Sequence, residues 1–319
     1  MGAISKIEWT DYSWNPILAR LGYMLGFHCE HMSEGCSHCY AETINRRLGT
    51  GLDFKPGNLD KLEISVAEKT LLAPLSWKKP KRISVCSMTD LFGEWVKDEW
   101  RDRMFAVMAL CPQHTWQVLT KRPKRMRGYF APHDLGLRWA NAIEALGLKG
   151  PSVETALDWD HNNLPNVWLG TSCEDQATAD ERIPDLLATP AAVRFVSCEP
   201  LLGPISLRWL SGIDHRALIS TRGRATELDG VRCIDWMIVR GESGPGARPM
   251  PPDWPRSIRD QCKQASVAYF HKHNGEYLPA VGQSCKYWVT NVGGLAMSRV
   301  GKKLAGRLLD GREHNEFPA

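Results

Sequence analysis

Residues 83–92 read ISVCSMTDLF, a short apolar run that ends abruptly in hydroxyl and acidic residues. The stretch that follows, residues 97–111 (KDEWRDRMFAVMALC), carries apolar residues at helical spacing. A continuous apolar run bounded in this way is typical of a buried parallel strand, and the two stretches together are typical of one βα unit. Residues 83–111 therefore predict a strand and a helix of an α/β fold.

Five further runs repeat the strand pattern. They are TWQVLTKRP (115–123), NVWLGTSCED (166–175), VRFVSCEPL (193–201), IDWMIVRGESG (234–244) and VAYFHKHNGE (267–276). Six βα repeats predict either a complete or partial barrel or a doubly wound sheet.

We expect one large domain over residues 1–319, because a chain of 319 residues that is 43% hydrophobic can bury a single large core. An N-terminal part, 1–82, precedes the βα repeats of 83–276. The gaps at 129–165 and 203–232 are longer than a βα unit requires, and we interpret them as insertions on the face at the carboxyl ends of the strands. Residues 277–319 are expected to form a basic terminal helix or arm.

Polar side chains follow each of the six predicted strands. They are Thr89 and Asp90, Thr120 and Lys121, Thr171 and Glu174, Ser197 and Glu199, Glu242 and Ser243, and Lys272 and Asn274. Ligand sites of parallel α/β folds lie at the carboxyl ends of the strands. These positions therefore predict a shared functional rim, although polar loops alone would also supply such residues.

A cluster of cysteines lies ahead of the repeats, in residues 26–42 (GFHCEHMSEGCSHCYAE). Cys29, Cys36 and Cys39 have the spacing C-x6-C-x2-C, and a disulfide is not expected in a reducing compartment. Three thiolates can hold three corners of a four-iron cluster and leave one iron open. A zinc site or no metal at all are the alternatives, and a zinc site would need a fourth ligand. The histidines that could supply it are His28, His31 and His38.

The net charge of +4 conceals two strongly basic windows. SWKKPKR (76–82) and KRPKRMR (121–127) hold nine positive charges and no acid. Such a window is usually a solvated surface, but two of them are also typical of a phosphate-binding face. The candidate nucleic-acid contacts are Lys78, Lys79, Arg122, Lys124 and Arg125.

The hydropathy pattern predicts a cytoplasmic protein. No apolar run approaches the roughly 18 to 20 residues that cross a bilayer. The start, MGAISKIEWTDY, lacks the charged-then-apolar layout of a signal peptide. We therefore expect no association with a membrane.

Several separate blocks of this sequence closely resemble one family, the phage-associated three-Cys-motif proteins of unknown function. The blocks are WTDYSWNP (9–16), the cysteine stretch (26–42), VCSMTDLF (85–92), QVLTKRP (117–123), WLGTSCED (168–175), RFVSCEPLLGPI (194–205), WMIVRGESGPGARPM (236–250) and VGKKLAGRLLDGR (300–312). The resemblance covers nearly the whole chain, and it implies a phage or prophage protein that works with a separate three-Cys-motif partner protein.

That family in turn resembles divergent radical S-adenosylmethionine (SAM) enzymes. This implies a partial TIM-like (β/α)6 barrel, a 4Fe-4S cluster on Cys29, Cys36 and Cys39, and S-adenosyl-L-methionine as a second cofactor. An external electron donor would reduce the cluster, and cleavage of SAM would give a 5′-deoxyadenosyl radical that acts on a nucleic acid or nucleotide, in DNA modification or repair. Expected cofactor contacts are Thr89, Asp90, Ser197, Glu199, Glu242 and Ser243, with Lys121 and Glu242 as catalytic candidates.

The chain departs from these patterns at four places. The first gap between cysteines is six residues instead of three, and His38 stands where radical SAM enzymes have an aromatic residue. Arg240 replaces a second glycine before GESG, and His271–Asn274 replace a Lys-Gln-Trp pattern. Two other functions therefore stay open: a zinc-stabilised nucleic-acid-binding or nuclease-like protein, and a non-catalytic module that binds the partner protein.

Overall fold

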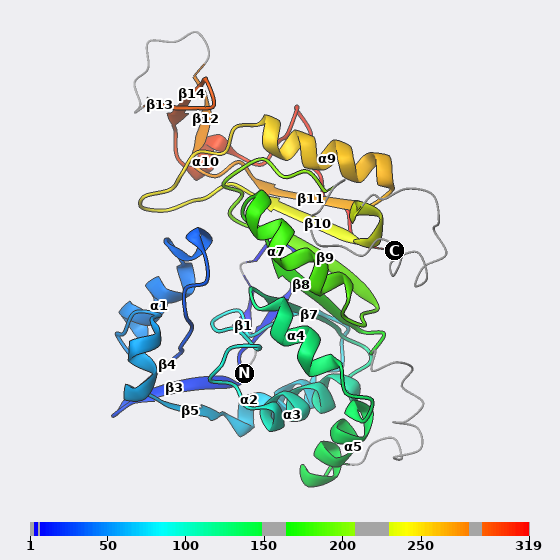
Figure 1. Ribbon diagram of the computed structural model, residues 1–319. Coiled ribbons are helices and arrows are strands. Elements are labelled where there is room, and N and C mark those ends of the chain that lie inside the picture. Colours follow the sequence, from blue (N-terminus) through cyan, green and yellow to red (C-terminus); the bar gives the residue numbers. More distant parts are fainter. Residues whose placement is uncertain (1–2, 6, 149–163, 208–229, 281–288, 319) are drawn as a thin grey trace. The chain divides into compact units, whose positions relative to one another are not determined.

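The structure is a computed structural model that describes residues 3–5, 7–148, 164–207, 230–280 and 289–318 (Figure 1). Contacts within the chain divide it into two compact units. The first unit comprises Met1–Met32, Cys39–Gly170 and Ala188–Val193, and the second comprises Ser33–His38, Thr171–Leu187 and Arg194–Ala319. This division does not test the prediction of one domain over 1–319, which stays a prediction.

One eight-stranded sheet has the order β1-β2-β6-β7-β8-β9-β10-β11. Its strands are β1 (Ala3–Ile4), β2 (Tyr12–Trp14), β6 (Arg82–Val85), β7 (Thr115–Thr120), β8 (Val167–Ser172), β9 (Val193–Cys198), β10 (Trp236–Arg240) and β11 (Ala268–His273). All except β1 run parallel. The six strands predicted from the sequence are β6 to β11, and they follow one another in chain order. The fold is therefore mixed α/β and compatible with the predicted partial TIM-like barrel.

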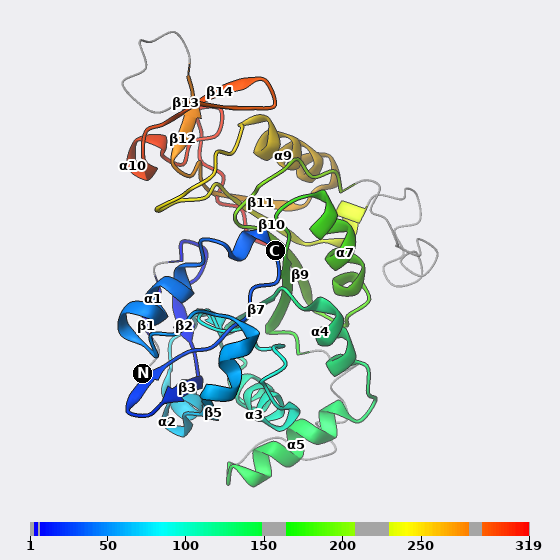
Figure 2. The same ribbon diagram turned by 60° about the vertical axis from the view of Figure 1, so that its left-hand side comes forward.

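The first unit packs three helices around an aromatic core. They are α3 (Asp98–Ala109), α4 (Pro123–Phe130) and α5 (Leu135–Ala145). Asp98 and Glu99 lie in the first turn of α3, where carboxylates stabilise the positive end of the helix dipole. Phe105 of α3 stacks on Trp139 of α5 with ring centroids 5.3 Å apart, and Figure 2 shows these two helices side by side. The helix predicted at 97–111 is thus confirmed as α3.

The N-terminal part of the first unit forms more structure than the sequence predicted. β2 adds a seventh parallel strand beside β6, and its Trp14 is fully buried 5.0 Å from Trp116 of β7. A separate antiparallel sheet has the order β4-β3-β5. The remaining elements here are β3 (Ile17–Leu21), β4 (Met24–Gly26), α1 (Tyr40–Leu48), η2 (Pro56–Lys61), β5 (Glu63–Val66), α2 (Glu68–Leu72) and η3 (Ala73–Ser76).

The second unit contains η1 (Glu34–Cys36), α7 (Gln176–Leu187), β9 to β11, η5 (Gly230–Cys233) and α9 (Asp253–Ala265). Trp236 of β10 is fully buried and packs against Phe195, Phe270 and Phe317. The hydroxyl of Tyr269 on β11 donates to a carbonyl of α9 at 3.1 Å. These contacts bury one face of β10 and tie the other face of β11 to a helix.

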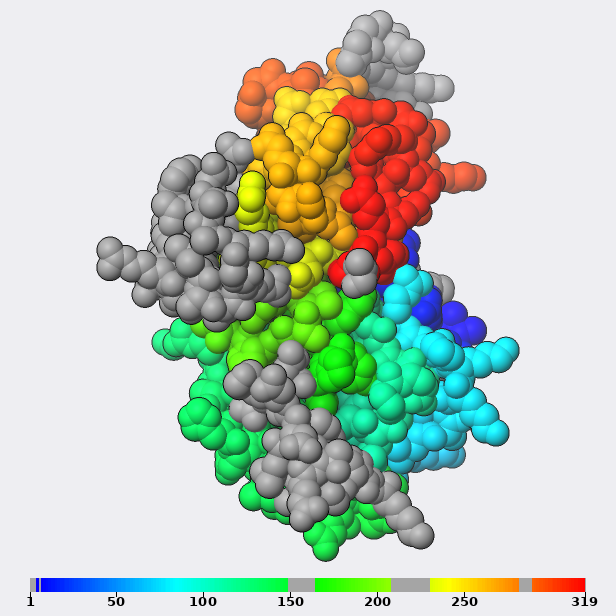
Figure 3. All heavy atoms as spheres, turned by 90° about the vertical axis from the view of Figure 1, so that its right-hand side faces the viewer, coloured from blue at the N-terminus to red at the C-terminus, as the bar shows by residue number. Residues whose placement is uncertain are grey.

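The described C-terminal residues differ from the expected basic helix or arm. They form a small antiparallel sheet of β12 (Tyr277–Pro279), β14 (Leu295–Arg299) and β13 (Val289–Val292), and among these described residues only α10 (Lys302–Ala305) is helical. The chain then returns to the main sheet, where the N–H of His271 donates to the carbonyl of His314 at 3.0 Å. Figure 3 shows this red C-terminal segment against the orange residues around α9 and β11.

The two expected insertions are described only in part. Within 129–165, α5 packs against α3 and so belongs to the helical layer rather than to a lid over the strand ends. Residues 149–163 and 208–229, where the rest of both insertions falls, lie outside the described residues. In the part of the chain that is described, no helix has both the length and the apolar composition needed to cross a bilayer.

Candidate functional site

The three cysteines of the opening stretch are thiols rather than disulfides. Cys36 is buried in η1, whereas Cys29 and Cys39 are half-buried. By its contacts Cys36 belongs to the second unit, and the other two belong to the first. Among the described residues no group of three or more His, Cys, Asp or Glu side chains is arranged to hold a metal ion. The cluster site therefore stays a prediction from cysteine spacing.

Each histidine of this stretch lies beside a glutamate. The pairs are His28 with Glu30, His31 with Glu42 and His38 with Glu242, at nitrogen–oxygen distances of 3.6, 3.2 and 3.1 Å. A carboxylate beside one ring nitrogen fixes the orientation of an imidazole, and the same arrangement is found behind metal-bound histidines. The pairing gives each histidine a structural partner and is compatible with either metal.

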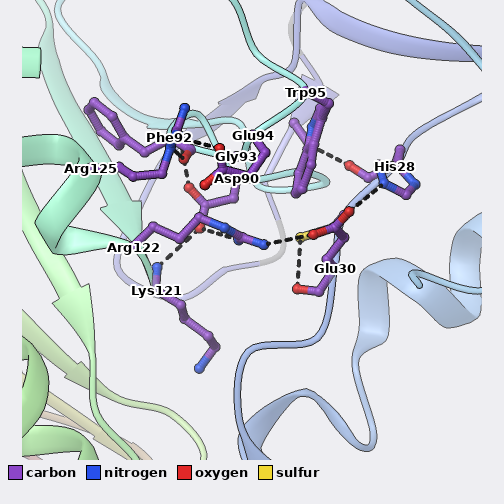
Figure 4. A network of polar contacts seen from close by, with 12 residues as sticks. His28, Glu30, Asp90, Phe92, Gly93, Glu94, Trp95, Lys121, Arg122 and Arg125 are labelled. Carbon is purple, nitrogen blue, oxygen red and sulfur yellow. Dashed lines mark hydrogen bonds and ion pairs between the residues drawn. The ribbon is translucent and has the colours of Figure 1, made fainter. Parts of the chain in front are cut away.

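A buried carboxylate joins the ends of β6 and β7 in the first unit (Figure 4). Asp90 is only 6% exposed. Its Oδ1 accepts hydrogen bonds from the Thr120 hydroxyl at 2.7 Å and the Phe92 N–H at 2.9 Å. Its Oδ2 accepts from the Lys121 N–H at 3.1 Å and from Nη1 of Arg122 at 3.2 Å. Four donors occupy most of the acceptor sites of Asp90. Asp90 therefore connects the turn at residues 87–90 to the turn at residues 120–123.

The same network reaches the segment around Cys29. The guanidinium carbon of Arg122 lies 4.9 Å from the ring centroid of Trp95, and its Nη2 lies 3.7 Å from Glu30. Trp95 meets the edge of the His28 ring at 4.8 Å, and the Thr89 hydroxyl donates to the His28 carbonyl. Burial lowers the pKa of His28 despite the attraction of Glu30. The residues on both sides of Cys29 are thus anchored to the strand ends.

A second carboxylate, Glu242 after β10, is the centre of a network in the second unit. Arg248 donates to Glu242 through Nε at 2.9 Å, Nη2 at 2.8 Å and its backbone N–H at 2.8 Å. Nη2 of Arg248 also donates to the carbonyl of Glu34 at 2.8 Å. Although burial favours the neutral acid, the hydrogen bonds from Arg248 lower the pKa of Glu242 below its ordinary value. Glu242 also meets His38, and its partner Arg248 binds Glu34, so the network holds segment 33–38 near both ends.

Two glycines allow this segment to approach so closely. A Cβ at Gly35 would lie 2.4 Å from Cγ of Glu174, which is 1% exposed and pairs with Arg182 at 3.1 Å. A Cβ at Gly246 would lie 2.6 Å from Nε2 of His38. Real Cβ atoms do not come so near, so each position excludes larger residues unless its neighbour moves.

A charged group lies at the ends of β9, β10 and β11. Glu199 accepts a hydrogen bond from Nζ of Lys272 at 3.0 Å, and Nε of Arg240 lies 3.3 Å from the same carboxylate. Arg240, one of the departures from the family pattern, therefore has a specific partner. Of the remaining predicted contacts, Ser197 is buried and its hydroxyl has no hydrogen bond within the described residues, while Ser243 is half-buried.

The second departure, residues 271–274, buries two imidazoles in β11. Nε2 of His271 lies 2.9 Å from Oδ1 of Asn274, and Nδ1 of His273 accepts from the N–H of Gly275 at 3.0 Å. Burial lowers the pKa of His271 to about 4 and that of His273 to about 2. Both histidines are therefore neutral at physiological pH.

The two basic windows do not form one continuous face. Lys78 and Lys79 are exposed and precede β6, whereas Lys124 and Arg125 follow β7. Because β6 and β7 are neighbouring parallel strands, the two windows lie at opposite ends of them. Arg122 is buried and bound to Asp90, so its guanidinium is not on the surface with the others. The two basic windows, which the sequence suggested could form one phosphate-binding face, are therefore separate in the structure.

Sequence reasoning missed the residues that complete both networks. Arg248 follows Glu242 by six residues in a turn rich in glycine and proline, and a lone arginine in such a turn was the only signal. Trp95 and Glu30 lie outside any periodic pattern. Their roles depend on contacts between segments far apart in the chain.

A comparison with protein families matches residues 4–318 to a family described as "Protein of unknown function (DUF5131)". No curated protein and no solved structure matches the chain significantly. The family match carries no information on phage association or on radical SAM chemistry, and both stay predictions.

Proposed function

This chain belongs to DUF5131, a family of unknown function, and we propose that it is a radical SAM-like iron–sulfur enzyme acting on a nucleic acid or nucleotide. In this proposal Cys29, Cys36 and Cys39 bind a 4Fe-4S cluster, and the parallel sheet is the partial barrel of such an enzyme. The observation that carries the proposal is the packing of the cysteine stretch against the carboxyl ends of parallel strands.

In the first unit, the contacts come from the residues next to Cys29. His28 meets Thr89 after β6, and Glu30 faces Arg122 after β7. Ligand sites of parallel α/β folds lie at these strand ends. The position of this segment therefore supports a functional thiol at Cys29.

In the second unit, the contacts come from segment 33–38, which contains Cys36. Glu242 and Arg248 hold it after β10, and Gly35 brings it against Glu174 after β8. The two units thus each place their own part of the cysteine stretch at strand ends. These positions support a role of the cysteine stretch in chemistry more than a purely structural metal site on an outer surface.

The donor set fits an iron–sulfur cluster. Thiolates are the usual ligands of such clusters, and three of them leave one iron open for a small molecule. Cys86 provides a contrast, because burial raises the pKa of its thiol far above the ordinary value and keeps it protonated. When bound, the cluster would supply the electron that cleaves SAM.

The chain's own residues would bind and orient. Glu242 and Arg248 would hold the segment around Cys36, while Asp90 and Arg122 would hold the strand ends near Cys29. The Glu199–Lys272 pair offers both charges to the polar groups of SAM or substrate. Lys121, half-buried after β7, is our candidate for a proton donor to the substrate.

The paired histidines favour a second candidate, a zinc-stabilised nucleic-acid-binding or nuclease-like protein. An imidazole whose second nitrogen faces a carboxylate is oriented as a zinc ligand would be. His38 has this arrangement, with Nδ1 toward Glu242 and Nε2 on its other side. A non-catalytic module that binds a three-Cys-motif partner protein is the third candidate.

Anaerobic purification with an absorption spectrum and iron, sulfide and zinc analysis separates these candidates. The proposal expects brown protein with about four irons per chain, loss of iron in Cys36→Ala, and retention in Cys233→Ala, a half-buried cysteine outside the stretch. With strong reductant, SAM should be cleaved to 5′-deoxyadenosine. Colourless protein with one zinc would falsify the proposal and establish the second candidate.

The nucleic-acid part of the proposal needs its own measurement. DNA binding should weaken with salt, because phosphate contacts release counterions. Lys78→Ala/Lys79→Ala and Lys124→Ala should reduce the salt slope separately, since these residues lie at opposite ends of β6 and β7. An unchanged slope in all variants would remove these windows from the interface.

A further inference from the structure

Helix α1 is inverted relative to an ordinary surface helix. Its buried residues are Ala41, Glu42 and Asn45, two of which are polar. Glu42 accepts a hydrogen bond from the N–H of Phe54 at 2.8 Å. Asn45 accepts from the N–H of Phe27 at 2.9 Å and donates to the carbonyl of Leu52 at 3.0 Å. The helix is therefore attached to the first unit through hydrogen bonds.

The apolar residues of α1 are exposed, although the hydroxyl of Tyr40 donates to the carbonyl of Ser87 at 2.6 Å. Tyr40, Ile44 and Leu48 are 48%, 43% and 82% exposed. Their spacing of four residues places them on one face of the helix. A surface helix normally turns such a stripe toward the core, so an outward stripe indicates a surface that another molecule covers. We call these three residues the α1 stripe.

The exposed charges on α1 itself are positive. The exposed charged residues of α1 are Arg46 and Arg47, and its single acid, Glu42, is buried. Arg46 pairs with Asp53, whereas Arg47 has no ion pair within the described residues. Arg47 lies three residues after Ile44 and so borders the stripe. An apolar centre with a cationic rim is complementary to a protein that presents an apolar patch rimmed by carboxylates.

The α1 stripe begins at the residue after Cys39, a proposed cluster ligand. We propose that it is the docking surface of a small acidic electron-transfer protein that reduces the cluster. This inference rests on the proposed function. In the transfer, the carrier loses one electron and the cluster gains it, with no other bond made or broken. Docking beside a ligand keeps the path of that electron short.

A second copy of the chain fits the α1 stripe less well. Two-fold pairing of the stripe would bring Arg47 near its own copy, and the exposed face of α1 has no acid to compensate. An acidic carrier meets opposite charge at Arg47. Interfaces of electron-transfer partners are small and transient, which suits a stripe of three residues.

The test measures binding of a flavodoxin, an acidic electron carrier, to the full chain. Ile44→Glu/Leu48→Glu should weaken binding about tenfold or more, because exposed anchors are lost and like charges are introduced. Ile44→Gln/Leu48→Gln should weaken it less. Leu304→Glu, at a leucine on α10 whose exposure of 65% lies between those of Ile44 and Leu48, is the matched control and should bind normally. Circular dichroism checks that all variants are folded.

Reduction of the cluster gives a second readout. Flavodoxin-dependent reduction should fall in Ile44→Glu/Leu48→Glu, whereas reduction by dithionite should equal that of the unaltered chain. Three outcomes would each overturn the inference. The first is equal flavodoxin binding by Ile44→Glu/Leu48→Glu, and the second is no binding by the unaltered chain at low salt. The third is self-association, or binding to phosphatidylserine vesicles, that Ile44→Glu/Leu48→Glu abolishes. Absence of iron would instead overturn the proposed function, and electron delivery with it.

Discussion

Asp90 and Glu242 occupy equivalent positions after parallel strands, yet they do different work. Asp90 is buried and accepts its four hydrogen bonds from neighbouring turns of the first unit. Glu242 binds Arg248 and His38, and so fixes a separate segment of the chain. A carboxylate at a strand end can thus stabilise the sheet itself or hold a functional loop, and its hydrogen-bond partners reveal which.

Asp90→Asn should have the largest effect on stability. The amide removes the charge opposite Arg122, whose guanidinium is 5% exposed, and leaves that buried cation facing the more distant Glu30 at 3.7 Å. Breaking a buried ion pair in this way costs about 3 to 5 kcal/mol. Urea unfolding measures the change in the free energy of unfolding. Glu94→Gln, at an exposed pair with Arg125, is the control and should change it little.

If Asp90→Asn were as stable as the unaltered chain, the contrast with Glu242 would be lost. Asp90 would then be available to a ligand, as the sequence first suggested.

Acid should weaken the strand ends of the second unit. His271 and His273 have pKa values lowered to about 4 and about 2, so the unfolded chain binds protons near pH 6.5 that the folded chain does not. Stability therefore falls as the pH drops below 6.5, by about 3 kcal/mol for both histidines between pH 7.5 and 5.5. Urea unfolding at the two pH values should show a smaller difference in His271→Gln/His273→Gln. The exposed His133→Gln should leave the difference unchanged.

Gly35→Ala should disturb the loop held in the second unit. The added Cβ would meet Glu174, whose pairing with the buried Arg182 would have to shift. Overpacking of this kind costs about 1 to 3 kcal/mol. Gly57→Ala is the matched control, because a Cβ there has nothing within 4 Å. Thermal unfolding of both variants distinguishes close packing at Gly35 from the general effect of replacing a glycine.

Glu242→Gln should have the smallest effect on global stability. Its network is only partly buried, so loss of the charge is expected to cost about 1 to 2 kcal/mol. The local effect should be larger, with faster hydrogen exchange in segment 33–38 and unchanged exchange in β6 and β7. Equal acceleration in both regions would show that Glu242 stabilises the sheet as Asp90 does.

The sequence predicted the strands well because each is a continuous apolar run ended by polar residues. β6 to β11 and α3 all lie where these patterns placed them. β2 was missed because three residues, Tyr12–Trp14, are too few for a pattern. The C-terminal strands were missed because they are only three to five residues long, and the basic stretch 300–312 that follows them suggested a helix or arm.

The candidate site was predictable only where chemistry and position coincide along the chain. Asp90, Glu199 and Glu242 were identified because each follows a strand. Arg248 was not, because its contacts to Glu242 and Glu34 depend on how a turn folds back. The basic windows were joined in error, since charge along a sequence does not show at which end of a strand it lies.

The return of the C-terminal residues to the main sheet has a consequence for the chain's behaviour in solution. β11 is the last strand in the sheet order, and the segment around His314 and Asn315 pairs with it. An uncovered edge strand is a template for pairing with other molecules. These few residues thus cover the edge of β11 and oppose aggregation through it. A chain shortened before His314 would leave that edge exposed.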